Sequence, residues 1–335
     1  MFDGTFQYQR YNDVETRIMQ FTGASSIGKD QSGQYTMYKI VMGNTSKPPI
    51  LITAGVHGVE TQTTQYTLHF FEQIRDNTFE DKAFRDNLLA NYCIVYLPCL
   101  NPWGMDNIPD YYAKFDRVHY RNVNYVDINR DFVAQSQQET KNVVKVMNDY
   151  NYFAHLDTHM MYPGYPLVNN ENYVVANENY NLQGLQNRYA DNWQKHTGTS
   201  VMRWDVQSER FQMVRGYSID KKNPYTPHTL PFMTEIMRPI HDQTLLTDEE
   251  IYKYGFYSLY EFFNIAEAYL NESKYPDGNK NDIKRIVTPT GEITFTRDIS
   301  GFVNEIKETK NNSILTTTFK RDSLGNLLEY TTSRK

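Results

Sequence analysis

A histidine and a glutamate stand three residues apart, directly after an apolar run of this 335-residue chain. Residues 50–60 read ILITAGVHGVE, so the run ends at Gly55 and is followed by His57 and Glu60. Such a run predicts a buried strand, and ligands of open α/β sheets bind beyond the carboxyl ends of strands. Imidazole and carboxylate groups are zinc ligands. The pair is therefore a candidate for part of a metal site, and a loop histidine beside a helix-capping glutamate is the alternative.

A third ligand is expected at the end of another strand. Residues 152–157 form a second buried segment that ends towards His159. His155, Asp157 and His159 alternate along it and should share one face of the strand. His159 is favoured as the ligand because it lies nearer the carboxyl end, and His155, the rival, is interpreted as a hydrogen-bonded interior histidine. A His, Glu, His set leaves one position open for water, as in catalytic zinc sites.

The elements that must position these residues are strands that alternate with helices. This alternation predicts an α/β domain whose mixed, largely parallel central sheet has helices on both faces. Residues 105–128 lack periodicity and are interpreted as a long active-site loop. Apolar patterns predict strands over 35–42, 50–54, 91–100, 152–157, 173–176 and 229–237, and helices over 11–21, 61–75, 132–150, 179–196 and 249–270.

The composition changes near residue 271, where a polar stretch rich in Pro and Gly begins. We expect a catalytic domain over residues 1–272, a linker over 273–282 and a small all-β module over 283–335. The module contains a repeat, FTRDISGFVNEI from Phe295 and FKRDSLGNLLEY from Phe319, which begins again after 24 residues. The Asp-x-x-Gly of each copy indicates a hairpin turn. Hairpins bury little alone, so the module should pack on the enzyme domain or on other chains.

Charge and composition narrow the function. The net charge of −6 argues against nucleic acid or an anionic membrane as the main partner. Cys93 and Cys99 fall in one predicted strand, roughly 20 Å apart, so we expect neither a disulfide nor a cysteine-based zinc site. The amino terminus lacks the pattern of a signal peptide, and no apolar run approaches membrane-spanning length. We therefore expect synthesis in the cytoplasm, with virion association as the alternative destination.

Over about residues 45–270 the chain resembles the M14 metallocarboxypeptidases. The resemblance implies a carboxypeptidase-like fold and the activity of a zinc metallocarboxypeptidase. The motifs that carry it follow the family's order and, roughly, its spacing: His57-x-x-Glu60, the Asn-Pro-Trp-Gly turn at 101–104, the Asp-x-Asn-Arg stretch at 127–130, His159 after a strand, and Glu235 in FMTEI.

The resemblance implies one zinc ion held by His57, Glu60 and His159. Asp127 would accept the outer N–H of His57 and so fix its tautomer. Glu235 would act as general base on water and then protonate the leaving amine. Alone, each of these residues has a simpler interpretation, such as Asp127 capping a turn, so the joint pattern carries the prediction.

Substrate contacts follow from the same resemblance. Asn129 and Arg130 would bind the terminal carboxylate of the substrate, since a planar guanidinium suits a carboxylate. The family's arginine that stabilises the oxyanion lies shortly before the motif that starts at Asp127. Arg121 is near that place but one residue out of register, and Arg117 is the alternative.

The specificity pocket is less completely matched. Residues 216–220, GYSID, are similar to the family's pocket segment, but Gln212 stands where its substrate-side tyrosine is expected. Tyr217 and Tyr225 are the candidates to contact substrate instead. Ile219 within the segment indicates a preference for apolar or neutral side chains.

Three functions are compatible with the sequence. The first is a zinc carboxypeptidase that removes the C-terminal residue of a peptide, with a peptidoglycan-type cell-wall peptide as a candidate substrate. The second is an N-acyl amino acid deacylase of the aspartoacylase or desuccinylase type. The third is a virion structural protein with a peptidase fold, because the 24-residue repeat resembles hairpin repeats of bacteriophage tail proteins. The β module would then join phage tail subunits or further copies of this chain in a homo-oligomer.

Overall fold

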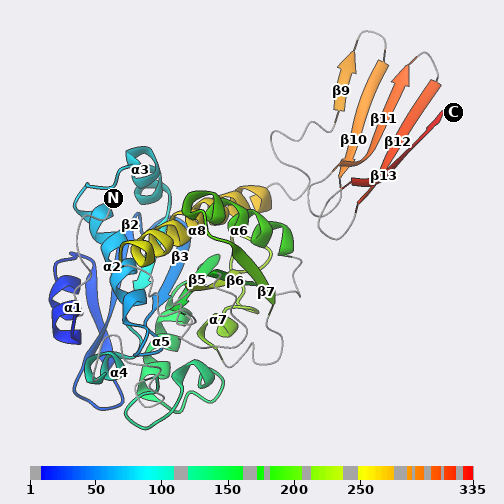
Figure 1. Cartoon of the computed structure of the whole chain (residues 1–335). Helices are drawn as coiled ribbons and strands as arrows, with labels where there is room; N and C mark the ends of the chain where they lie inside the picture. Colours follow the sequence, from blue (N-terminus) through cyan, green and yellow to red (C-terminus); the bar gives the residue numbers. More distant parts are fainter. Residues whose placement is uncertain are drawn as a thin grey trace.

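The described residues of the chain form two β-sheets in the computed structural model (Figure 1). The larger has eight strands in the order β1-β2-β4-β3-β5-β8-β6-β7, and the smaller has five in the order β13-β12-β11-β10-β9. The structure describes residues 9–108, 120–160, 172–176, 182–205, 213–236, 248–274, 285–288, 291–297, 303–310, 313–321 and 327–334.

Strands and helices are interspersed along the first 274 residues. The strands of the large sheet are β1 Ala24–Lys29, β2 Thr36–Gly43, β3 Pro49–Ala54, β4 Cys93–Leu97, β5 Ala154–Met160, β6 Asn172–Ala176, β7 Val201–Asp205 and β8 Leu230–Ile236. The helices are α1 Tyr11–Ile18, α2 Thr61–Arg75, α3 Lys82–Asn91, α4 Pro102–Asn107, α5 Gln138–Asp149, α6 Gln183–Thr197, α7 Val214–Tyr217 and α8 Asp248–Lys274, with a short 3-10 helix at Ile128–Arg130.

Parallel pairing at the centre of the large sheet brings the candidate site together. β4, β3, β5 and β8 are parallel neighbours, while β1–β2, β2–β4 and β6–β8 are antiparallel, which confirms a mixed, largely parallel sheet. Thr53 pairs with Asp157, and His159 pairs with Glu235. The polar residues at these strand ends therefore lie along one edge of the sheet.

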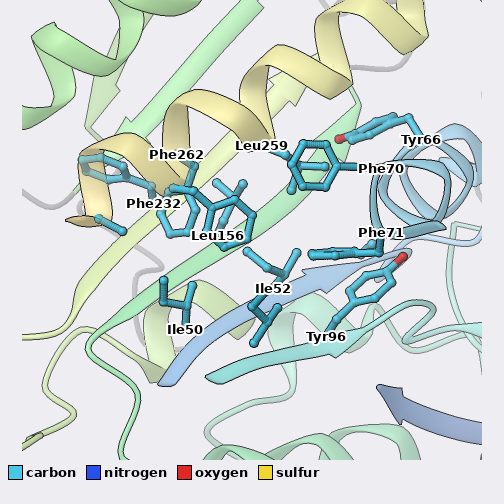
Figure 2. Close-up of a cluster of buried hydrophobic side chains, with 14 of the residues drawn as sticks. Ile50, Ile52, Tyr66, Phe70, Phe71, Tyr96, Leu156, Phe232, Leu259 and Phe262 are labelled. Carbon is cyan, nitrogen blue, oxygen red and sulfur yellow. The ribbon is translucent and has the colours of Figure 1, made fainter. Parts of the chain in front are cut away.

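Alternate residues of the buried strands face two separate cores. Figure 2 shows Ile50, Ile52, Leu156 and Phe232 of the sheet together with Phe70, Phe71, Leu259 and Phe262 of α2 and α8. On the opposite face Leu51 and Val95 belong to a second cluster with Val143 and Met147 of α5. Each fully buried side chain of this kind contributes about 1.5–3 kcal/mol. The expectation of helices on both faces is confirmed.

Several predicted boundaries differ from the structure. The Asn-Pro-Trp-Gly segment begins helix α4 instead of forming a turn, because the side chain of Asn101 accepts a hydrogen bond from Gly104 N and Pro102 suits a first helical turn. α5 begins at Gln138 and not at Phe132, because the Asp131 carboxylate accepts from the backbone N–H groups of residues 136 and 137 and holds the chain in a turn.

Both cysteines are buried and free, but Cys99 lies beyond the end of β4. α8 continues to Lys274, past the boundary predicted at residue 272. The division into domains stays a prediction. None of the described helices has the length and apolar character to cross a membrane.

The small sheet is antiparallel throughout and repeats one hairpin. It consists of β9 Arg285–Thr288, β10 Gly291–Arg297, β11 Val303–Lys310, β12 Ser313–Arg321 and β13 Leu327–Arg334. Phe295 pairs with Ile306 in the first hairpin, and Phe319 pairs with Tyr330 in the second, so both partners shift by 24 residues. An irregularity follows at the same place in each. The Asp-x-x-Gly turns lie outside the described residues.

Candidate active site

Three predicted ligands converge at the carboxyl ends of the central strands. His57, Glu60 and His159 each offer a ligand atom, and these atoms lie within 4.8 Å of one another. Nδ1 of His57 is 2.7 Å from one Glu60 oxygen, and Nδ1 of His159 is 3.3 Å from the other. All three side chains are buried. Among the described residues this is the group suited to a metal ion, and its His, Glu, His donors fit zinc.

The turn after β3 delivers His57 and Glu60 to this position. Gly55 has a φ of +65°, and a Cβ there would lie 2.5 Å from Thr64 Oγ1, so glycine is required. Thr63 closes the turn because its hydroxyl accepts from Gly55 N and donates to the carbonyl of Glu60. Glu60 occupies the N-cap position of α2 without a side-chain cap hydrogen bond, and α2 begins at Thr61 as predicted.

Carboxylates hold the outer nitrogen of each imidazole. Nε2 of His159 is hydrogen-bonded to Asp157 Oδ2 at 2.8 Å, whereas Nε2 of His57 faces Asp127 Oδ1 at 3.4 Å, an ion-pair distance without hydrogen-bond geometry. With a proton held on Nε2, Nδ1 of each ring points to Glu60, and a metal ion bound there would replace the Nδ1 proton. Both imidazoles are therefore oriented to offer Nδ1 to a metal ion.

His155 lies outside the ligand set. Its two ring nitrogens are 3.0 Å from Thr53 Oγ1 and 2.7 Å from Ser218 Oγ. Thr53 also donates to Asp157 at 2.7 Å. His155 is thus the interior, hydrogen-bonded histidine that the sequence favoured, and it supports Asp157 through a shared threonine.

The ligand residues form a cluster of opposite charges that shift one another's pKa values. Burial lowers the pKa of His57 and of His159, but neighbouring carboxylates raise both by more: chiefly Glu60 for His57, and Asp157 and Glu60 for His159. Burial would raise the pKa of Glu60, yet the two imidazoles bring it down to about 2. The carboxylates thus favour positive charge at the centre, which protons supply in the ion-free protein and a divalent cation would supply in their place.

Glu235 lies beside the ligands on β8. It is half-buried, and its strand position pairs with that of His159. Burial raises the pKa of Glu235 to about 7; His159 and His57 oppose the rise, while Glu60 and Asp157 add to it. A carboxyl group with a pKa near neutrality can accept and return a proton at physiological pH.

The Asp-x-Asn-Arg segment brings two further predicted residues to the site. The backbone N–H of Asn129 donates to Asp127, and Asn129 Oδ1 accepts from Val214 N at 3.0 Å. Asn129 Nδ2 is buried and has no hydrogen-bond partner among the described residues. Arg130 donates to the carbonyl of Asn129, and its charge helps to lower the pKa of Asp127. Asn129 therefore keeps a donor available beside a cationic side chain.

The other predicted residues are not brought to the ligands by any contact of the described residues. Arg121 is exposed, and Arg117 and Gln212 lie outside the described residues. The Tyr217 hydroxyl donates to Asn148 of α5. Tyr225 packs against the core on the α2 and α8 side. The roles given to Arg121, Tyr217 and Tyr225 stay predictions.

Two residues of the site were not predicted. Asp157 holds His159, and the alternation of residues 155, 157 and 159 along β5 was the signal that could have found it. Tyr120 stacks on the ring of His57, with ring centroids 3.7 Å apart and planes 20° from parallel. Its position depends on how the loop before Asp127 folds, and no local sequence pattern predicts it.

A model of the zinc carboxypeptidase family, Peptidase M14, matches residues 8–256. The chain belongs to this family. Its members are zinc-dependent, which agrees with the His, Glu, His group, and the chain is accordingly a metallocarboxypeptidase. No curated protein matches it.

Solved carboxypeptidases share the fold of this M14 member. A metallo-carboxypeptidase from Burkholderia cenocepacia is 13% identical with a TM-score of 0.61, and covers 79% of this chain and 70% of its own. Carboxypeptidase A from Helicoverpa armigera is 15% identical with a TM-score of 0.57, covering 79% and 74%. A metallo-carboxypeptidase from Pseudomonas aeruginosa, solved with (2-guanidinoethylmercapto)succinic acid, is 14% identical with a TM-score of 0.59, covering 79% and 70%. These likenesses confirm the predicted carboxypeptidase-like α/β architecture.

Proposed function

We propose that this chain hydrolyses the last peptide bond of a peptide and releases its C-terminal residue, using one zinc ion held by His57, Glu60 and His159. The observation that supports this proposal most directly is the convergence of those three side chains beside Glu235. A zinc ion bound there would polarise the scissile carbonyl and lower the pKa of a water molecule.

The residues of the chain divide the remaining work. Glu235, with its pKa near neutrality, takes the proton from water and later gives it to the leaving amine. Asp127 and Asp157 hold the two imidazoles in the ligating tautomer. Because a carboxylate already faces the outer nitrogen of each ring, the imidazoles need no rearrangement as the reaction proceeds.

Recognition of a free carboxylate would make the enzyme an exopeptidase. The buried Nδ2 of Asn129 and the guanidinium of Arg130 are hydrogen-bond donors on one segment. Arginine binds a carboxylate through two parallel hydrogen bonds. A substrate whose C-terminal carboxylate is blocked should therefore bind poorly.

The hairpin repeat of the small sheet is the basis for a proposal about the partners of this protein. Its described residues in β12 and β13 are half-buried or exposed, so they form little core of their own. We assign to this sheet attachment to other subunits, with phage tail subunits or further copies of this chain as partners. A peptidoglycan-type stem peptide is the corresponding substrate.

The test is a screen of peptides with a blocked N-terminus and a free C-terminus, with release of free amino acids as the readout. Parent protein with one equivalent of zinc should release the last residue. Glu235→Gln should lower kcat by at least about 100-fold without loss of zinc, and His57→Ala should lose the ion.

Glu261→Gln is the matched control, because Glu261 of α8 is a buried carboxylate that pairs with His196 of α6. Undiminished hydrolysis by Glu235→Gln would refute the mechanism. Release only from N-acyl amino acids would favour the deacylase instead, and zinc binding with no hydrolysis at all would favour the structural role.

A further inference from the structure

The loop before Asp127 turns Tyr120, and not Arg121, towards the metal centre. The Tyr120 ring lies flat against the His57 imidazole, 3.7 Å between centroids. The next side chain, Arg121, is exposed to solvent. The residue one position before the expected arginine therefore occupies the inner side of the loop.

A buried asparagine fixes this loop. Asn122 Oδ1 accepts from Asn124 N and Val126 N, while Asn122 N donates to the carbonyl of Val126. Asn122 Nδ2 donates to Gln137 at 3.0 Å and to Glu139 at 3.2 Å, which anchors the loop to the start of α5. Asn122 is fully buried. The scaffold thus sets the orientation of the side chain two residues earlier.

The Tyr120 ring, stacked on His57, is close enough to the active-site charges for them to act on its hydroxyl. The charges that act on it are those of Asp127, Glu60, Arg130 and Glu235. In the proposed reaction, Arg130 binds the terminal carboxylate and Glu235 serves the attacking water. The scissile carbonyl, one residue from that carboxylate, must lie between these two groups, and the charges of both act on the Tyr120 hydroxyl.

We propose that Tyr120 is a further catalytic residue, whose hydroxyl donates a hydrogen bond to the scissile carbonyl oxygen as negative charge develops on it. The assignment rests on the proposed function and gives this tyrosine the part expected of Arg121. A tyrosine is a neutral donor at physiological pH. A donor aimed at a developing oxyanion changes kcat by about 10²–10³.

Tyr120→Phe tests the assignment, because phenylalanine keeps the stack on His57 and removes only the hydroxyl. We expect kcat to fall by about 100-fold while zinc affinity, measured by chelator competition, stays at the parent value. Tyr125→Phe is the matched control: Tyr125 belongs to the same loop but is 62% exposed, and its variant should keep parent activity.

A second readout does not depend on turnover. A zinc-loaded protein should bind a peptide phosphonate, whose tetrahedral oxygens mimic the developing oxyanion, and Tyr120→Phe should weaken this binding by at least about tenfold. Binding of a free amino acid product should not change, because it reports on the terminal carboxylate.

Tyr120→Phe with kcat within about threefold of the parent and unchanged phosphonate affinity would overturn the assignment. So would Arg121→Ala losing both while Tyr120→Phe keeps both. A parent protein that releases no C-terminal residue overturns the proposed function and this assignment together, whereas an active parent with an unaffected Tyr120→Phe variant overturns this assignment alone.

Discussion

Replacing Asp157 separates the charge of its carboxylate from its geometry. One oxygen faces Nε2 of His159 at 2.8 Å, and the other accepts from Thr53 at 2.7 Å. In Asp157→Asn the amide oxygen can still accept from His159, and the amide NH₂ can face Thr53, whose hydroxyl is free to accept and to donate to His155 instead. The hydrogen bonds survive in this variant, and the negative charge is lost.

The two expected losses follow from that difference. Removing an outer-shell partner of a metal ligand typically weakens metal binding by about 10–100-fold, or about 1.4–2.8 kcal/mol. Asp157→Asn should lie near the tenfold end. Asp157→Ala should weaken zinc binding by closer to a hundredfold, because no carboxylate then keeps a proton on Nε2 of His159. Asp127→Asn should cost less than Asp157→Asn, since Asp127 is 3.4 Å from His57 and more exposed.

The assay is zinc competition with a chelator of known affinity at fixed pH. Asp30→Asn provides the control, because Asp30 is a buried carboxylate that accepts from Ser32 and Tyr35 near β1 and β2. Its zinc affinity should equal that of the parent. If Asp157→Ala bound zinc within about twofold of the parent, the outer carboxylate would not position His159 and the reasoning would fail.

Other predictions concern protons, packing and domain division. Near pH 6, below the ordinary histidine pKa of about 6.5, the raised pKa values of His57 and His159 keep both side chains protonated without the ion. Zinc binding should release a proton from each, so zinc affinity should rise with pH. Calorimetry in buffers of different ionisation enthalpy measures this release, and finding none would contradict the prediction. These imidazoles should stabilise the ion-free fold fully below pH ~6.5, an effect lost as pH rises through their folded pKa values. A Gly-to-Ala change inside a helix usually stabilises it by about 1 kcal/mol. Gly255→Ala should instead destabilise the protein by about 1–3 kcal/mol, because its Cβ would lie 2.3 Å from the Tyr66 ring. A raised midpoint of urea unfolding would show this packing argument to be wrong. Deleting residues 283–335 should leave zinc affinity intact, and loss of the ion would refute the predicted division.

The parts of the fold predicted from sequence are those with an apolar pattern. β3, PILITA, is an almost unbroken apolar run, β5 begins directly after the apolar Tyr152 and Phe153, and α2 repeats Tyr66, Phe70 and Ile74 at helical spacing. β1 has the sequence ASSIGK, an edge strand with little apolar signal, and β7 is short. Their pairing depends on β2 and β6, which supply hydrogen bonds that no local pattern encodes.

The metal ligands were predictable for a related reason. Strand ends mark where side chains gather, so His57 and His159 could be paired across a hundred residues by topology alone. Tyr120 could not, because its place depends on the hydrogen bonds that Asn122 makes to α5. The position of a residue that depends on how a loop folds can be found only from the structure.

The identical register of the two hairpins has a consequence for how this chain can evolve. β13 is an edge strand of the small sheet, and β11 already shows how a following hairpin adds to such an edge. Duplication of one 24-residue unit after β13 would therefore lengthen the sheet by two strands and leave every present strand pair as it is. The small sheet can therefore grow by one hairpin at a time without any change to the sequence of the catalytic residues.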